Sequence, residues 1–218
     1  KIGQWSSVTV DENHWKKVKS EEIKLIISAC SGLYLEAVSN TQEVTPGSVV
    51  KLNLESINRS STVMQLVSVT TLPEQKTTVF NTDLKNNSAQ NSTIDLQLPQ
   101  SVNYTQPYWL KEKGTIGLYT VEDQKNIGIP DIIREAKVIF NVKINGIEIP
   151  FERTIVYKYN DDVKGEMYNF LDIVPVVTTT IQDKVLLFTN TKSKYVGITI
   201  KAGKNDLKGN LKLDLPKD

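Results

Sequence analysis

The chain has 218 residues with 26 basic and 25 acidic side chains, and it contains one cysteine and one histidine. A lone Cys30 excludes an internal disulfide or a multi-cysteine metal cage, and a lone His14 cannot form a multi-histidine zinc site. The balanced charge, without a basic block, argues against nucleic acid as a partner, and no apolar run reaches the roughly 18 residues of a membrane span. We expect Cys30 to be a small buried side chain and His14 to be structural or exposed.

The first predicted element is one short N-terminal helix. Ser20 is a suitable N-cap, Glu21 and Glu22 fall in the first turn, where the helix dipole favours carboxylates, and Gly32 suits the helix end. Apolar side chains share one face of this helix, namely Ile23, Ile26, Ile27 and Cys30. We expect this face to pack against a sheet, and binding to a partner is the alternative.

From residue 33 the pattern changes to a period of two, which is typical of strands with one buried face. Leu33, Leu35 and Ala37 share one face of the first strand. Further strands are predicted at residues 49–57, 63–71, 76–80, 93–98 and 115–121, with a polar loop at 86–92. Short strands separated by polar turns predict a mainly β fold, an antiparallel immunoglobulin-like β-sandwich.

The strongest local signal is a hairpin over residues 136–159 with Asn145-Gly146 as its two-residue turn. The turn sets the register, so the face that should be apolar pairs Ile144 with Ile147, Val142 with Ile149, Phe140 with Phe151 and Val138 with Arg153. A ribbon with one apolar face needs a second layer to cover it, which again favours a sandwich.

Beyond this hairpin, strands are predicted at residues 169–180, 184–189, 195–201 and 207–215, and Pro175 suggests a crossover between layers. The strands after Pro175 are fewer than the roughly seven of a complete immunoglobulin sandwich. We therefore expect a lead-in segment and helix at 1–32, a β-sandwich domain at 33–173 and a partial second immunoglobulin-like β-domain at 174–218. The chain reads as a portion of a longer polypeptide.

Several short stretches together resemble the region after the catalytic domain in large bacterial PIG-L (LmbE-like) deacetylases. The likeness covers most of residues 19–177, and its motifs are Cys30-Ser31-Gly32-Leu33-Tyr34-Leu35-Glu36-Ala37, Val44-Thr45-Pro46-Gly47, Asn58-Arg59-Ser60, Gln106-Pro107-Tyr108-Trp109-Leu110, Gly128-Ile129-Pro130, Gly165-Glu166 and Ile173-Val174-Pro175. The tail is similar to the immunoglobulin-like domains appended to bacterial glycoside-active enzymes.

Deacetylases of this family are zinc hydrolases acting on N-acetylated sugars, with a His-Pro-Asp-Asp type motif and a further histidine. Neither is present, because His14 is followed by Trp15 and Asp161-Asp162 follows Asn160. The resemblance therefore implies a non-catalytic accessory region, without catalytic residues or metal ligands of its own. It would be a scaffold or spacer that aids glycan engagement, with zinc in an upstream catalytic domain of the same chain as its partner. The family also implies an extracytoplasmic location: periplasmic, cell-surface or secreted.

Two other functions remain open for this sequence. A stand-alone carbohydrate-binding or adhesive surface module would use exposed aromatic rings, because the apolar face of a sugar stacks on them. Tyr104, Tyr108 and Trp109 form the densest aromatic cluster. We expect these rings to plug the core, and the sugar platform is the alternative. An enzyme in its own right is the least favoured reading, since the chain has one histidine and no nucleophile elbow.

Charged side chains add two smaller questions. Asn160, Asp161, Asp162 and Glu166 supply oxygens in one short loop, where a solvated turn is favoured over a calcium site because the spacing matches no EF-hand. Arg153 falls on the apolar face of the hairpin, where an unpaired charge is costly. We expect it to form a structural ion pair with Glu166 or Asp172, and a position beyond the covered part of the ribbon is the alternative.

Overall fold

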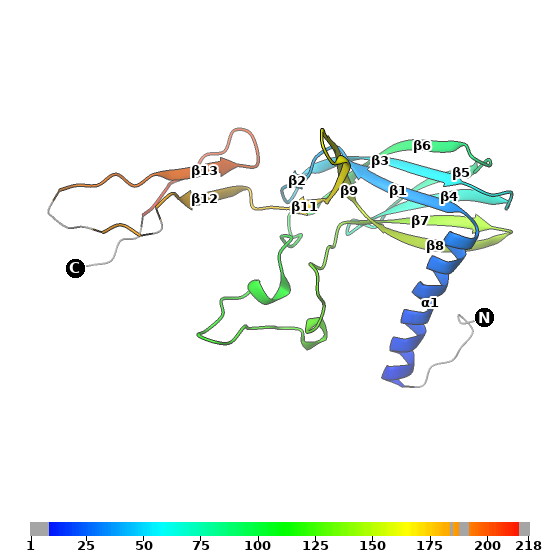
Figure 1. Cartoon of the computed structure of the whole chain (residues 1–218), viewed down its shortest axis with the longest axis horizontal. Helices are drawn as coiled ribbons and strands as arrows, with labels where there is room; N and C mark the ends of the chain where they lie inside the picture. Colours follow the sequence, from blue (N-terminus) through cyan, green and yellow to red (C-terminus); the bar gives the residue numbers. More distant parts are fainter. Residues whose placement is uncertain (1–8, 184, 188–191, 214–218) are drawn as a thin grey trace.

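The computed structural model of the chain, which describes residues 9–183, 185–187 and 192–213, contains two sheets that face each other (Figure 1). The first has the strand order β10-β9-β1-β3-β6, with β1 (Leu33–Ser39), β3 (Val49–Asn58), β6 (Ala89–Gln97), β9 (Val156–Asp161) and β10 (Gly165–Phe170). The second has the order β5-β4-β7-β8, with β4 (Met64–Leu72), β5 (Lys76–Asp83), β7 (Lys137–Ile144) and β8 (Ile147–Thr154). The predicted mainly β, antiparallel sandwich is confirmed.

Alternation along the strands places the core between the two sheets. In β1, Leu33, Leu35 and Ala37 are buried, as the period-two pattern predicted. Among the described residues, the buried apolar side chains all fall between Leu33 and Ile173. The largest of them come from both layers, and they include Phe140, Phe151, Leu52 and Leu54. Each sheet therefore covers the apolar face of the other, and the hairpin predicted at 136–159 gains the second layer that it needs.

The hairpin β7–β8 has the predicted register, with Ile144 opposite Ile147 and Val138 opposite Arg153. Asn145 and Gly146 have φ values of 47° and 85°, the left-handed pair that a type I′ turn requires. The second strand is shorter than predicted, since it ends at Thr154. Ile155, fully buried, then carries the chain into the other sheet, where β9 pairs with β1 in parallel.

The helix differs from the prediction at its start. It is α1 (Val10–Cys30), 21 residues long, and its N-cap is Thr9, whose hydroxyl accepts from the Glu12 amide while the Glu12 carboxylate accepts from the Thr9 amide. The helix therefore begins at this capping box and not at Ser20. Ser20 lies inside the helix, where its hydroxyl donates to the Lys16 carbonyl oxygen. The end at Gly32 is confirmed by its φ of 66°.

The predicted packing of the helix face is wrong for most of its length. Only the C-terminal part touches the sandwich, where Ile27 lies against the core and the Ser28 hydroxyl donates to the Leu33 carbonyl oxygen. Ile26 is 60% exposed and Cys30 is also exposed, so Cys30 is not the buried side chain that we expected. Figure 1 shows the reason, because α1 projects away from the sheets instead of lying along one.

Between β6 and β7 the chain makes a long excursion over residues 98–136. It contains two short 3-10 helices, η2 (Tyr108–Leu110) and η3 (Gln124–Asn126), and the strand predicted at 115–121 is absent. Only an isolated bridge joins Thr115 and Leu118, because no sheet edge is offered to this alternating segment. The predicted polar loop at 86–92 is also partly wrong: β6 already begins at Ala89, since β3 supplies an edge as far as Ile57.

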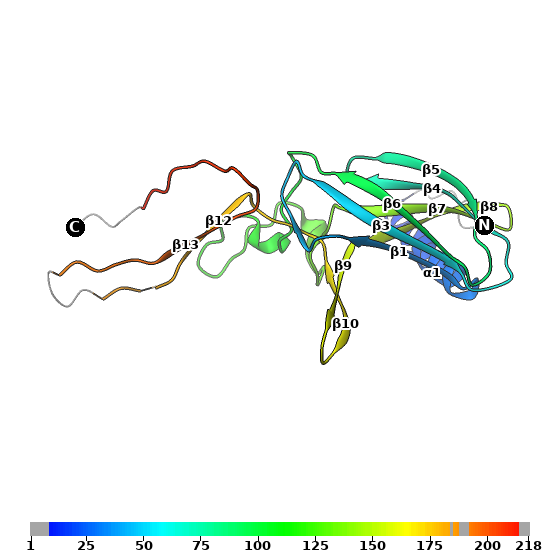
Figure 2. The ribbon, with the colours of Figure 1, turned by 90° about the horizontal axis from the view of Figure 1, so that it is seen from above.

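The last strands leave the sandwich. A short β11 (Asp172–Ile173) pairs in parallel with β2 (Glu43–Val44), and after Pro175 the hairpin of β12 (Val177–Ile181) and β13 (Ile198–Ala202) extends outward (Figure 2). Its strands are largely exposed. The strand predicted at 184–189 lies partly outside the described residues, and its described part, 185–187, has no strand. The same holds for 207–215, of which 207–213 is described. No helix among the described residues is long and apolar enough to cross a membrane.

Gly146→Val should destabilise the fold by about 1 to 3 kcal/mol, because a β-branched residue is strained at the left-handed backbone angle of this turn. The free energy of unfolding in urea measures the change. Gly209→Ala is the matched control: Gly209 lacks a left-handed φ, a Cβ there meets nothing within 4 Å, and the expected change is under about 0.5 kcal/mol. Equal stability of Gly146→Val and the unmodified chain would contradict the turn assignment.

Candidate functional site

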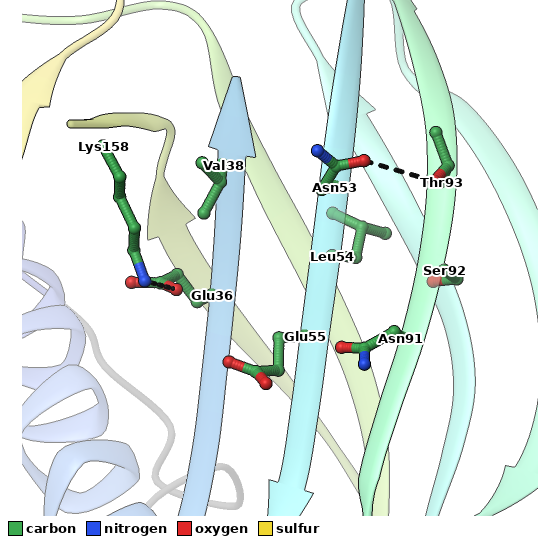
Figure 3. Close-up of a pocket in the computed structure, with 9 residues that line it drawn as sticks. All are labelled: Glu36, Val38, Asn53, Leu54, Glu55, Asn91, Ser92, Thr93 and Lys158. Carbon is green, nitrogen blue, oxygen red and sulfur yellow. Dashed lines mark hydrogen bonds and ion pairs between the residues drawn. The ribbon is translucent and has the colours of Figure 1, made fainter. Parts of the chain in front are cut away.

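A polar groove of about 450 Å³ lies on the outer face of the five-stranded sheet (Figure 3). Because alternate residues of each strand point into the core, the others point outward, and in β1, β3 and β6 most of these are polar. The groove is lined by Glu36, Val38, Asn53, Leu54, Glu55, Asn91, Ser92, Thr93 and Lys158. It gathers polar and charged side chains from four strands in one hollow of the sandwich, and we take it as the candidate site.

Strand register arranges these side chains in rows across the sheet. Glu36 of β1 is directly opposite Glu55 of β3, which in turn is opposite Asn91 of β6. In the next row, Asn53 is opposite Thr93, and the Thr93 hydroxyl donates to the Asn53 side-chain oxygen at 3.2 Å. The groove thus presents carboxylates, amides and a hydroxyl within neighbouring cross-strand positions.

Lys158 of β9 forms one wall of the groove. Its Nζ lies 2.5 Å from Glu36 Oε2 and 3.8 Å from Glu166 Oε1, and it sits over the Tyr168 ring at 4.9 Å. Burial alone would lower the pKa of Lys158, but the hydrogen bond and charge of Glu36 outweigh it and raise that pKa. Lys158 therefore stays charged and fixes the Glu36 carboxylate at the edge of the groove.

Tyr34 lies next to this pair on β1. Burial raises its pKa to about 12, and the hydrogen bond and negative charge of Glu36 contribute to the increase. The Arg59 guanidinium covers the Tyr34 ring at 4.8 Å. Tyr34 thus remains a neutral hydroxyl beside Glu36, and the two strands β1 and β9 are joined by a continuous polar network at this end of the groove.

The predicted aromatic cluster lies elsewhere, in the excursion between β6 and β7. Tyr108 and Trp109 meet edge to face with ring centroids 4.9 Å apart, and the Tyr108 hydroxyl oxygen accepts from the Gly128 amide. Both are half-buried, Tyr104 is exposed, and none of the three belongs to the buried core. They do not plug the core, and none of them lines the groove.

The predicted ion pair of Arg153 is wrong. Its Nε donates to the Leu35 carbonyl oxygen at 3.3 Å and its Nη1 to the Glu152 carbonyl oxygen at 2.9 Å, and no described carboxylate pairs with it. Burial lowers the pKa of Arg153. Because the chain changes sheets at Ile155, backbone carbonyl oxygens at the sheet junction accept hydrogen bonds from the guanidinium. Glu166 instead pairs with Lys158 and accepts a hydrogen bond from the Tyr168 hydroxyl.

Asp172 pairs with Arg134, a residue that the sequence analysis did not single out. Arg134 Nη2 lies 3.4 Å from Asp172 Oδ1, and the guanidinium stacks on the Phe170 ring at 4.3 Å, with only 11% of its side chain exposed. Its Nη1 is 3.7 Å from Asp131. No periodic signal marks Arg134, because it precedes β7 in an irregular segment. The pair fastens the end of the excursion to the sandwich.

The acidic loop between β9 and β10 is a turn, as favoured by its composition. Asp161 Oδ1 accepts from the amides of Val163 and Lys164 at 2.9 and 2.8 Å, and these bonds lower the pKa of Asp161. Among the described residues, no group of three His, Cys, Asp or Glu side chains could hold a metal ion.

Comparisons with known proteins returned nothing: no family model, no curated protein and no solved structure matches the chain. None of the groove residues was predicted as a functional site from the sequence, although Glu36 lies within a motif of the resemblance. A signal was present, since Glu36, Asn53 and Glu55 all occupy outward positions of the predicted strands. It could have been used only with the pairing of β1, β3 and β6 in hand.

The Tyr34 hydroxyl should titrate at about pH 12, measured as the difference in tyrosinate absorbance between the unmodified chain and Tyr34→Phe. Its folded pKa exceeds the unfolded value of about 10, so the associated stabilisation is complete below pH 10 and is lost as the pH rises to 12. Between pH 10 and 12, Tyr34→Phe should therefore lose less free energy of unfolding than the unmodified chain. Parallel losses in both proteins would rule out the shift.

Arg134→Ala should cost about 1.5 to 3 kcal/mol in the free energy of unfolding, because it removes charged hydrogen bonds and the stacking on Phe170. Glu166→Gln is the comparison, because its ion pair is exposed and should contribute less than about 1 kcal/mol. A larger effect at Glu166 than at Arg134 would contradict the assignment of Arg134 as the stronger, buried anchor.

Proposed function

We propose that this chain is a non-catalytic accessory region of a PIG-L-like N-acetyl-sugar deacetylase, with a sandwich of the immunoglobulin-like type that supports and spaces the enzyme and engages its glycan. Strand order supports the fold type. With the long strands taken as A (β1), B (β3), C (β4), C′ (β5), E (β6), F (β7) and G (β8), the two sheets are ABE and C′CFG. The orders A-B-E and C-F-G are those of an immunoglobulin constant domain, whereas D is missing, C′ is added, and β9 and β10 extend the first sheet beyond A.

The motifs that carry the resemblance have structural roles, as a scaffold requires. Gly32 ends α1 with a left-handed φ. Gly47 also has a left-handed φ, in the turn before β3. The buried Asn58 side chain donates to the carbonyl oxygens of Thr62 and Leu84 and accepts from the Ser60 amide, so it ties three segments together. Zinc chemistry would then belong to a catalytic domain of the parent enzyme, and a His and Asp metal constellation before Lys1 is expected there.

The groove is the single observation that carries glycan engagement. Sugars are bound by groups that exchange hydrogen bonds with hydroxyls, and Asn53, Asn91 and Thr93 offer amide donors, amide acceptors and a hydroxyl on one open surface. These side chains sit on paired strands and not on loops, so their spacing is held by the backbone ladder. An elongated ligand could lie across the three strands without a change of the fold.

The exposed aromatic side chains favour the second candidate, a stand-alone carbohydrate-binding or adhesive surface module. Tyr104 is 44% exposed, and the Tyr108 and Trp109 pair is only half-buried. Sugar rings stack on such side chains. The two functions therefore differ in the place where the glycan binds, the groove for one and the aromatic excursion for the other.

Titration with neutral oligosaccharides, followed by calorimetry, distinguishes these sites. The double change Asn53→Ala and Asn91→Ala should weaken binding about tenfold or more, since each lost hydrogen bond is worth about 0.5 to 1.5 kcal/mol. Trp109→Ala is the control and should keep the affinity. The reverse pattern would assign binding to the aromatic module, and no binding of any oligosaccharide would reject glycan engagement and leave the scaffold role alone.

A further inference from the structure

We propose that Glu55 makes the groove selective for glycans that carry a free primary amine. This inference rests on the proposed glycan-binding function of the groove and assigns the class of sugar that it takes, which is the deacetylated product of the proposed enzyme in preference to its N-acetylated substrate. Its basis is an imbalance in the groove, where the two facing carboxylates, Glu36 and Glu55, have very different surroundings. The imbalance is visible in Figure 3, where Glu36 is joined to Lys158 and Glu55 is joined to nothing.

Glu36 is fully engaged. Its side chain is 13% exposed, it lies 2.5 Å from the Lys158 ammonium, and it faces the neutral hydroxyl of Tyr34. Lys158 is also committed, since its charge is shared with Glu166 and its position is held over the Tyr168 ring. No cation in this network is left to serve a second groove carboxylate.

Glu55 has no hydrogen bond or ion pair with any described residue of the chain, yet it is only half-exposed. It stands directly opposite Glu36 in the ladder of β1 and β3. Like charges at directly opposed positions destabilise a sheet. One negative charge in the groove thus remains uncompensated, and a bound cation would relieve the repulsion as well as pair with the carboxylate.

The neighbours of Glu55 indicate what kind of cation fits. Asn91 is its cross-strand partner on the other side, and Asn53 and Thr93 occupy the next row, so the charge lies among groups that suit hydroxyls. An ammonium group offers three donors, which match the Glu55 carboxylate together with amide oxygens. An amino sugar places such an ammonium next to hydroxyls on one ring. An anionic sugar would meet the uncompensated carboxylate of Glu55 and be repelled.

The experiment compares three tetrasaccharides by calorimetry at low salt: a glucosamine tetramer, its N-acetylated counterpart and an uncharged glucose tetramer. The glucosamine tetramer should bind about tenfold more tightly than the other two, the size expected for one charged hydrogen bond. Raising the salt concentration should reduce this preference, because the pair is open to solvent. A tetralysine peptide should bind weakly, since it lacks hydroxyls for the amides.

The variant Glu55→Gln, which keeps the shape of the side chain, should bind all three tetrasaccharides within about twofold of one another. Glu148→Gln, an exposed carboxylate on β8 in the opposite sheet, should retain the preference. Unfolding in urea should show Glu55→Gln at least as stable as the unmodified chain, because the repulsion with Glu36 is removed.

Outcomes against the inference are distinct from those against the proposed function. Equal binding of the amine-bearing and N-acetylated tetramers, or an amine preference that survives in Glu55→Gln, would overturn the role of Glu55 while glycan binding stands. Tetralysine binding as tightly as the glucosamine tetramer would overturn the sugar class. If no tetrasaccharide binds the unmodified chain, the proposed glycan function fails, and the inference fails with it.

Discussion

The passage of the chain from one sheet to the other at Ile155 is the constraint on which the rest of the sandwich depends. The strand β8 belongs to the four-stranded sheet, and directly after the fully buried Ile155 the same strand direction continues as β9 in the five-stranded sheet. A crossing of this kind buries an apolar side chain at the corner and leaves the backbone hydrogen-bonded on both sides. It also explains why Arg153, two residues before the corner, is satisfied by carbonyl oxygens of both layers.

The same passage builds the groove. Without β9 beside β1, the outer face of β1, β3 and β6 would be an open polar surface, and Glu36 would have no ammonium partner. Lys158 arrives two residues into β9 and turns this surface into a hollow with a charged wall. The parallel pairing with β1 is short, so the wall is held largely by side chains: the Lys158 and Glu36 pair and the network around Tyr34 and Tyr168.

The sequence predicted those parts of the fold that depend on interactions between residues close together in the chain. The Asn145 and Gly146 turn and the alternation of β1 and β3 were legible, because a two-residue turn and a period of two each act within a few residues. The course of 98–136 and the partner of Arg153 were not, since each is decided by which sheet edge or side chain arrives from far along the chain. The start of α1 was missed for another reason: Ser20 and Thr9 are both suitable N-caps, and the prediction took Ser20 although the Thr9 and Glu12 capping box is local. The groove belongs to this second group: its rows join strands separated by dozens of residues, so its members are ordinary outward-facing polar residues until the pairing is known.

The helix α1 has a geometric consequence for whatever is attached to its beginning. Its 21 residues span about 31 Å at the usual rise per residue, and it is fixed to the sandwich only near Ile27 and Ser28. A helix of that kind is rigid, so it sets both the distance of an attached group from the sandwich and its rotation about the helix axis. Adding a single residue within it would rotate an attached group by about 100° around that axis while moving it only about 1.5 Å. The direction in which a group attached at the start of α1 faces the groove would thus depend on the length of α1.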